Sequence, residues 1–197
     1  MCRLIETIQL LNGQVQYIDW HNKRFNESRF ELFGINSELD LKSIILVPKE
    51  FLAGEVKCRI IYQKTIELIE FELYAFRQIR SLKTIIHDEI QYNYKYYDRS
   101  SINDLYSQRG DKDDILIIKK GMVSDSSYSN LVFSDGKNFH TPSSPLLKGT
   151  KRAKYISEGK IAEKDLTVKD IRKYGEIHLI NAFLDLGRCV VPVNNIF

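Results

Sequence analysis

Cysteine is scarce in this sequence, and its three thiols are far apart. Cys2, Cys58 and Cys189 are odd in number and form neither a Cys-x-x-Cys pair nor a cluster with histidine. A disulfide framework needs paired cysteines, and a zinc site needs closely spaced sulfur or imidazole ligands. We therefore expect three buried thiols, no disulfide framework and no metal site.

Long apolar runs and an excess of one charge are also missing. No stretch approaches the roughly 20 apolar residues of a membrane span, and residues 1–11 lack the apolar centre of a signal peptide. The 29 basic and 26 acidic side chains are mixed along the chain, which leaves a net charge of +3 and no polybasic run. We expect a globular cytoplasmic protein that binds neither membranes nor nucleic acid, and a small anionic ligand suits its charge better.

The first third of the chain predicts two hairpins around one helix. Residues 4–11 and 14–18 flank Asn12-Gly13, a dipeptide that type I′ turns favour because both central residues need positive φ. Residues 21–33 have apolar side chains at helical spacing and stop before Gly34, a common residue after a helix. The β-branched and aromatic runs at 56–62 and 66–74 predict the second hairpin.

Residues 75–83 carry three basic side chains and little periodicity, which predicts a linker. We expect an N-terminal α+β domain over residues 1–80 and a second domain over residues 81–197. In the second domain the apolar runs predict strands at 115–118, 131–133, 138–141, 176–181 and 189–193, and helices at 151–158 and 168–174.

Lys95 lies among four tyrosines, Tyr92, Tyr94, Tyr96 and Tyr97. Aromatic rings reduce the hydration of an amine, which lowers its pKa and makes it a usable nucleophile toward an aldehyde. An edge strand with a solvated lysine that discourages aggregation has the same pattern. The spacing alone favours the edge strand.

Two further segments have useful chemistry but also ordinary explanations. Residues 121–130 form a polar loop between predicted strands, where sites are often found, and Asp125 and Asn130 are its carboxylate and amide. A plain turn has the same composition. Residues 146–152 open a predicted helix, whose free N–H groups attract anions, and Gly149 allows a phosphate to approach the backbone. Taken alone, the segment favours an ordinary helix start.

Taken in order, these segments resemble the class IV aminotransferase and aminodeoxychorismate lyase family, which uses pyridoxal phosphate (PLP). The family shows His-x-x-Arg on its first helix, an isolated lysine, an acidic loop ending in asparagine, and Thr-Pro followed by Leu-x-Gly before a helix. The matching residues are 21–24, Lys95, 121–130 and 141–152. The tail from Asn181-Ala182 to Pro192-Val193 resembles the lyase branch.

The resemblance implies a fold, a cofactor and an assembly. The fold would be the α+β, two-part PLP fold type IV of D-amino acid aminotransferases, with a small N-terminal α/β part and a larger, barrel-like, cofactor-binding C-terminal part. PLP would lie in a cleft between the parts. We expect a homodimer, because the family builds its sites at a two-fold interface.

The resemblance also implies roles for single residues. Lys95 would bind the PLP aldehyde covalently and move protons, and Asp125 would pair with the pyridine nitrogen in place of the family's longer glutamate. Glu6 matches the Phe-Glu-Thr-Ile strand that lines the active site. The other expected cofactor contacts are Arg24, Asn130, Gly149, Thr150, Lys151, Asn181 and Ala182. Of these, Arg24 and the N–H groups of Thr150 and Lys151 would hold the phosphate, although an exposed ion pair is the commoner fate of a helical arginine.

The family offers two main reactions on a small anionic amino substrate. One is the conversion of 4-amino-4-deoxychorismate to 4-aminobenzoate and pyruvate, which the short chain and the Asn181-Ala182 tail favour. The other is amino transfer of the branched-chain or D-amino acid type. Arg59 is a candidate for binding a substrate carboxylate, or an exposed strand arginine. A non-catalytic binding protein that kept the fold is a third hypothesis.

Overall fold

The computed structural model describes residues 2–197 and divides them into two compact units. The first unit comprises the chain up to Phe76 together with Tyr94–Asp98, and the second comprises Arg77–Asn93 and Arg99–Phe197. The chain therefore leaves the first unit at Phe76, close to the predicted boundary at residue 80. It returns for the short segment that carries Lys95, which the prediction had assigned to the second domain.

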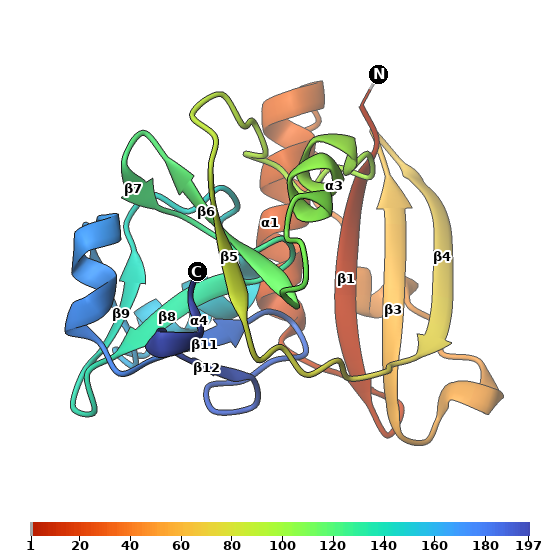
Figure 1. Ribbon diagram of the computed structural model, residues 1–197. Helices are drawn as coiled ribbons and strands as arrows, with labels where there is room; N and C mark the ends of the chain where they lie inside the picture. Colours follow the sequence, from red (N-terminus) through yellow and green to blue (C-terminus); the bar gives the residue numbers. More distant parts are fainter. Residues whose placement is uncertain (1) are drawn as a thin grey trace. The chain divides into compact units, whose positions relative to one another are not determined.

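An antiparallel sheet of four strands forms the first unit, in the order β2-β1-β3-β4 (Figure 1). The strands are β1 (Leu4–Leu11), β2 (Gln14–Val15), β3 (Glu55–Tyr62) and β4 (Ile66–Leu73). Both predicted hairpins are confirmed. Asn12 and Gly13 have φ of 49° and 77°, as a type I′ turn requires.

Helix α1 (Ile18–Phe33) covers one face of this sheet. Leu4, Ile8 and Leu10 alternate along β1 and pack with Phe25 of the helix in one buried cluster. The helix begins three residues earlier than predicted and ends, as predicted, at Gly34, whose φ is 68°. The short elements α2 (Leu41–Ile44) and η1 (Lys49–Phe51) lead from α1 to β3.

Two sheets build the second unit, one of five strands in the order β10-β9-β8-β11-β12 and one of three in the order β5-β6-β7. The strands are β5 (Leu82–Ile86), β6 (Asp114–Lys119), β7 (Met122–Val123), β8 (Asn130–Ser134), β9 (Phe139–Pro142), β10 (Ala162–Lys164), β11 (Glu176–Ile180) and β12 (Val190–Pro192). Leu116 of β6, Phe133 of β8 and Leu179 of β11 belong to one buried cluster, so the two sheets share a core. The helical elements are α3 (Ser100–Ser107), α4 (Thr150–Ser157), η2 (Val168–Lys173) and η3 (Val193–Asn195).

The α+β class in two parts is confirmed, with local differences. The predicted linker is wrong at its end, because Leu82 and Lys83 belong to β5, a strand that pairs in parallel with β6. The predicted helix at 168–174 is a 3₁₀ helix, capped by the reciprocal Thr167 and Asp170 hydrogen bonds. Cys58 and Cys189 are buried as expected, but Cys2 is exposed because it precedes the first strand.

Residues 2–197 include no helix that combines the length and the apolar character needed to cross a membrane.

Candidate active site

Lys95 lies on a segment whose backbone pairs with the start of β1. The Ile5 N–H donates to the Lys95 carbonyl at 2.9 Å, and the Tyr97 N–H donates to the Arg3 carbonyl at 2.9 Å. Leu4 and Tyr96 form the antiparallel bridge between these two bonds. Opposite residues in such a pair share one face, so Tyr96 faces the α1 side with Leu4. Lys95 is the central residue of a tight turn, which the Tyr96 N–H closes by donating to the Tyr94 carbonyl at 2.9 Å.

The tyrosines around Lys95 therefore have different surroundings. Tyr94 and Tyr96 are partly buried and pack against the cluster that includes Leu4 and Phe25. Tyr92 belongs to the second unit, where it is buried near Arg99. Tyr97 is half-buried, and its ring contacts Arg59. The amine is thus carried on a paired backbone, which restricts where it can reach.

Glu6 connects β1 to α1 through a buried ion-pair cluster. Nε and Nη2 of Arg24 donate to its two carboxylate oxygens at 2.8 and 2.6 Å, and Nδ1 of His21 lies 2.7 Å from Oε2. Burial raises the pKa of Glu6, but Arg24 and His21 outweigh burial and lower it to about 2. The carboxylate is therefore ionised at neutral pH and orients Arg24. Its predicted contact with substrate stays a prediction.

His21 is the neutral member of this cluster. Burial lowers its pKa, hydrogen bonding to Glu6 opposes the change, and the charges of Arg24 and Lys95 lower the pKa further. A neutral imidazole that donates from Nδ1 to Glu6 is consistent with all three effects. The influence of Lys95 on His21 also indicates that the Lys95 charge acts on the same part of the first unit as Arg24.

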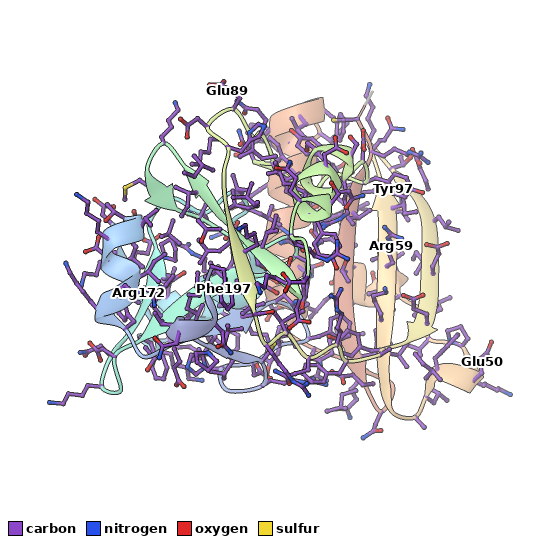
Figure 2. The ribbon with its side chains drawn as sticks, in the orientation of Figure 1. Glu50, Arg59, Glu89, Tyr97, Arg172 and Phe197 are labelled. Carbon is purple, nitrogen blue, oxygen red and sulfur yellow. The ribbon has the colours of Figure 1, made fainter. Side chains whose placement is uncertain are left out.

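Arg59 lies on the side of the sheet opposite α1, because its neighbours Cys58 and Ile60 belong to the cluster that packs with the helix. It stands opposite Thr7 of β1, and its guanidinium carbon is 5.4 Å from the centre of the Tyr97 ring. Arg3 contacts the same ring at 4.3 Å. Figure 2 shows Arg59 and Tyr97 over the sheet of the first unit. The predicted contact between Arg59 and a substrate carboxylate stays a prediction.

In the second unit, Asp125 and Asn130 connect the polar loop at residues 121–130 to Leu147, which precedes α4. The Asn130 side-chain amide donates to Asp125 Oδ1 and to the Leu147 carbonyl, both at 2.8 Å, and the Leu147 N–H donates to Asp125 Oδ2 at 2.9 Å. Burial raises the pKa of Asp125 to about 6, although these two donors oppose the rise. At pH 7 the group is mostly a carboxylate, and its remaining lone pairs can accept a further N–H.

Gly149 is required by the position of Asn130. A Cβ at Gly149 would lie 2.0 Å from Asn130 Oδ1, which is far inside van der Waals contact. Helix α4 begins at the next residue, Thr150, and in the described part of the chain no side chain caps it. The backbone at this helix start is thus suited to an anion, as predicted for the PLP phosphate.

Three further residues are predicted to contact the cofactor: Lys151, Asn181 and Ala182. Nζ of Lys151 donates to Asp185 at 2.6 Å, so any contact of Lys151 with a phosphate would come from its backbone. Asn181 donates to Ser129 of the polar loop at 3.0 Å and accepts from the Phe183 N–H at 2.9 Å. Ala182, which stands between Asn181 and Phe183 in the sequence, is half-buried.

The functional groups of these residues are of the chemical types that bind PLP. Asp125 can accept from a pyridinium N–H, the start of α4 and Arg24 suit a phosphate, and a lysine can bind an aldehyde. Lys95 and Arg24 belong to the first unit, whereas Asp125, Asn130 and the start of α4 belong to the second. Sequence reasoning missed His21 as the partner of Glu6, and it missed Arg3. The His-x-x-Arg spacing could have identified His21, because it places the imidazole one helical turn before Arg24.

Comparison with known proteins gives consistent matches. The sequence profile of the family described as amino-transferase class IV matches residues 95–196. An uncharacterized protein of Haemophilus influenzae is 40% identical over 184 residues, which are 92% of this chain and 98% of the relative.

Solved structures are similar over nearly the whole chain. A candidate 4-amino-4-deoxychorismate lyase from Haemophilus somnus has a TM-score of 0.89 and 32% identity, with 94% of this chain and 98% of that chain covered. The PLP-bound form of a hypothetical aminotransferase from Mycobacterium tuberculosis has a TM-score of 0.77 and 17% identity, with 99% and 81% covered. The second similarity concerns the fold alone. Together with the family match, the first confirms the expected fold type IV.

Proposed function

This chain belongs to the class IV aminotransferase family of PLP-dependent enzymes, and we propose that it is a lyase that converts 4-amino-4-deoxychorismate to 4-aminobenzoate and pyruvate. The observation that carries this choice is the 32% identity to the Haemophilus somnus protein, a candidate for the same reaction. The lyase-like tail from Asn181-Ala182 to Pro192-Val193 supports it. Membership of a family of enzymes argues against a non-catalytic role.

We propose PLP as the cofactor, with Lys95 as its covalent attachment point. When bound, PLP supplies an electron sink for negative charge that forms at the substrate carbon. Lys95 would also carry protons, because a neutral amine can take a proton from one carbon and deliver it to another. The backbone pairing with Arg3 and Ile5 fixes the starting point of this side chain.

Asp125 has an electrostatic role in the proposal. Its carboxylate would accept a hydrogen bond from the ring N–H of the cofactor and so favour the protonated nitrogen. Asn130 and the Leu147 N–H fix both carboxylate oxygens, so the side chain needs no reorganisation when charge develops. Because aspartate is one methylene shorter than the family's glutamate, the backbone of this loop must approach the ring more closely or a water must bridge them.

The start of α4 and Arg24 would hold the cofactor phosphate. The N–H groups at the start of α4 would donate to it, and Gly149 leaves the backbone open to close approach. Arg24 contributes its positive charge, and Glu6 holds the guanidinium by two hydrogen bonds. His21 and Glu6 are thus positioning residues for Arg24.

A product assay tests the proposal and separates it from its main alternative. The purified, PLP-loaded protein is incubated with 4-amino-4-deoxychorismate, and pyruvate and 4-aminobenzoate are measured. We expect both products in equal amounts, and neither from Lys95→Ala. No pyruvate, combined with amino transfer from a branched-chain or D-amino acid to a keto acid, would instead assign an aminotransferase.

A further inference from the structure

Two arginines of the first unit face one tyrosine beside the Lys95 segment. We propose that Arg3, Arg59 and Tyr97 form a binding site for a small substrate with two carboxylates. The inference rests on the proposed function only for the reacting end of that substrate, which Lys95 marks. It adds Arg3 and Tyr97 to the expected role of Arg59 and names a dicarboxylate as the ligand class.

The two guanidinium groups lie close together around the ring. Their central carbons are 4.3 Å and 5.4 Å from the same ring centroid, so they are within about 10 Å of each other. Two positive charges at this separation repel, and the ring quadrupole offsets only part of that cost. An anion placed between or beside them would remove the repulsion.

The protein does not supply that anion. Within residues 2–197, neither Arg3 nor Arg59 forms an ion pair or a side-chain hydrogen bond, and each contacts the Tyr97 ring. This is notable for Arg59, because Glu70 stands directly opposite it on β4. Two residues away on the same strands, Lys57 and Glu72 stand opposite each other and do form an ion pair. Arg59 thus packs on the Tyr97 ring and forms no ion pair with the Glu70 carboxylate opposite it.

The position of this cluster relates it to Lys95. Tyr97 follows Lys95 by two residues, so their Cα atoms are at most about 7 Å apart. Arg59, opposite Thr7 on β1, contacts the Tyr97 ring. A substrate that reacts at Lys95 therefore has the two arginines, which contact Tyr97, close to its reacting end.

The chemistry of the three side chains selects the ligand class. A guanidinium fork matches a carboxylate in a bidentate geometry, and two forks suit two carboxylates. The Tyr97 ring offers a flat apolar surface for the carbon skeleton that joins them. A monocarboxylate would leave one arginine without a partner, so the site should discriminate against it.

Calorimetric titration of the PLP-loaded protein tests the inference with defined probes. Succinate, glutarate and adipate are compared with butyrate, valerate and hexanoate, which match them in length but have one carboxylate. We expect at least one dicarboxylate to bind about tenfold or more tightly than its partner, the difference that one charged hydrogen-bonded contact gives. Equal affinities in all three pairs would overturn the proposal.

Three variants assign the effect to residues. Arg3→Gln and Arg59→Gln should each reduce the dicarboxylate preference about tenfold, whereas Arg172→Gln, an exposed arginine labelled in Figure 2, should leave it unchanged. Arg3 is itself exposed and precedes β1, so its variant is expected to fold even if Arg59→Gln does not. A preference that survives in both folded variants would show that the site lies elsewhere.

The same samples separate this inference from the proposed function. PLP loading is followed by absorbance, independently of the titration. If PLP does not bind but the dicarboxylate preference still depends on Arg3 and Arg59, the proposed function fails and the binding site stands. If PLP binds and pyruvate is released without any dicarboxylate preference, the reverse holds.

Discussion

Asp125 is the residue at which charge can be removed with almost no change in shape. Asp125→Asn keeps the side-chain volume but cannot keep the ring nitrogen of the cofactor protonated, so the electron sink should weaken. We expect turnover to fall by about a hundredfold or more, while PLP affinity changes much less because the phosphate contacts persist. The measurements are steady-state kinetics and PLP titration. Glu89→Gln, which removes an exposed charge, is the control. Turnover within a few-fold of the parent would remove Asp125 from the ring's surroundings.

The pKa of Asp125 also predicts how stability depends on pH without the cofactor. Burial raises this pKa from 3.8 to about 6, so the native state holds the proton more tightly than the unfolded chain does. The stabilisation is complete below about pH 4 and is lost as pH rises through 6, which amounts to about 3 kcal/mol. Urea unfolding from pH 4 to 7 should therefore show the parent losing stability relative to Asp125→Asn. A constant difference between the two proteins across this range would contradict the assigned environment.

The start of α4 depends on one contact between elements. Gly149→Ala would place its Cβ against the Asn130 amide, which must then leave Asp125 and Leu147. We expect the free energy of unfolding to fall by about 1–3 kcal/mol, as for other overpacked sites. The backbone itself tolerates alanine, because φ at residue 149 is −69°.

A double-mutant cycle isolates this contact. In the Asn130→Ala background the clash is absent, so Gly149→Ala should cost clearly less there than in the parent. PLP affinity should follow the same pattern. Additive losses would show that the glycine is needed for another reason.

Elements with strong local signals could be predicted from the sequence. The Asn12-Gly13 turn, the end of α1 at Gly34 and the buried strand β6 follow from local residue preferences. Strand β5 could not, because basic residues obscure its apolar pattern and its parallel partner β6 lies about thirty residues further along the chain. Helix α3 was missed because Arg99 before it provides no side-chain cap.

Some residues of the candidate site could likewise be predicted from the sequence, and others could not. Lys95, Asp125, Asn130 and Gly149 stand in motifs, so resemblance to a family could find them. Arg3 stands in no motif, and its relation to Tyr97 depends on pairing between segments that are more than ninety residues apart in sequence. The hydrogen bonds of Asn130 to Leu147 likewise depend on the fold rather than on local spacing.

At the scale of the whole molecule, we propose that the enzyme is a homodimer. The resemblance to the family implies active sites built at a two-fold interface. Sedimentation velocity at micromolar concentration should give about twice the 23.0 kDa mass of one chain. A monomer that is fully active at the same concentration would contradict this assembly.

We propose above all that this PLP-dependent enzyme attaches its cofactor at Lys95. The most direct test is to incubate the purified protein with PLP, reduce it with borohydride and locate the adduct by mass spectrometry of its peptides. We predict the adduct on Lys95 in the parent and in the control Lys137→Ala, an exposed lysine elsewhere. We predict none in Lys95→Ala, with an unchanged unfolding temperature. An adduct on another lysine, or a reducible adduct in folded Lys95→Ala, would contradict the account.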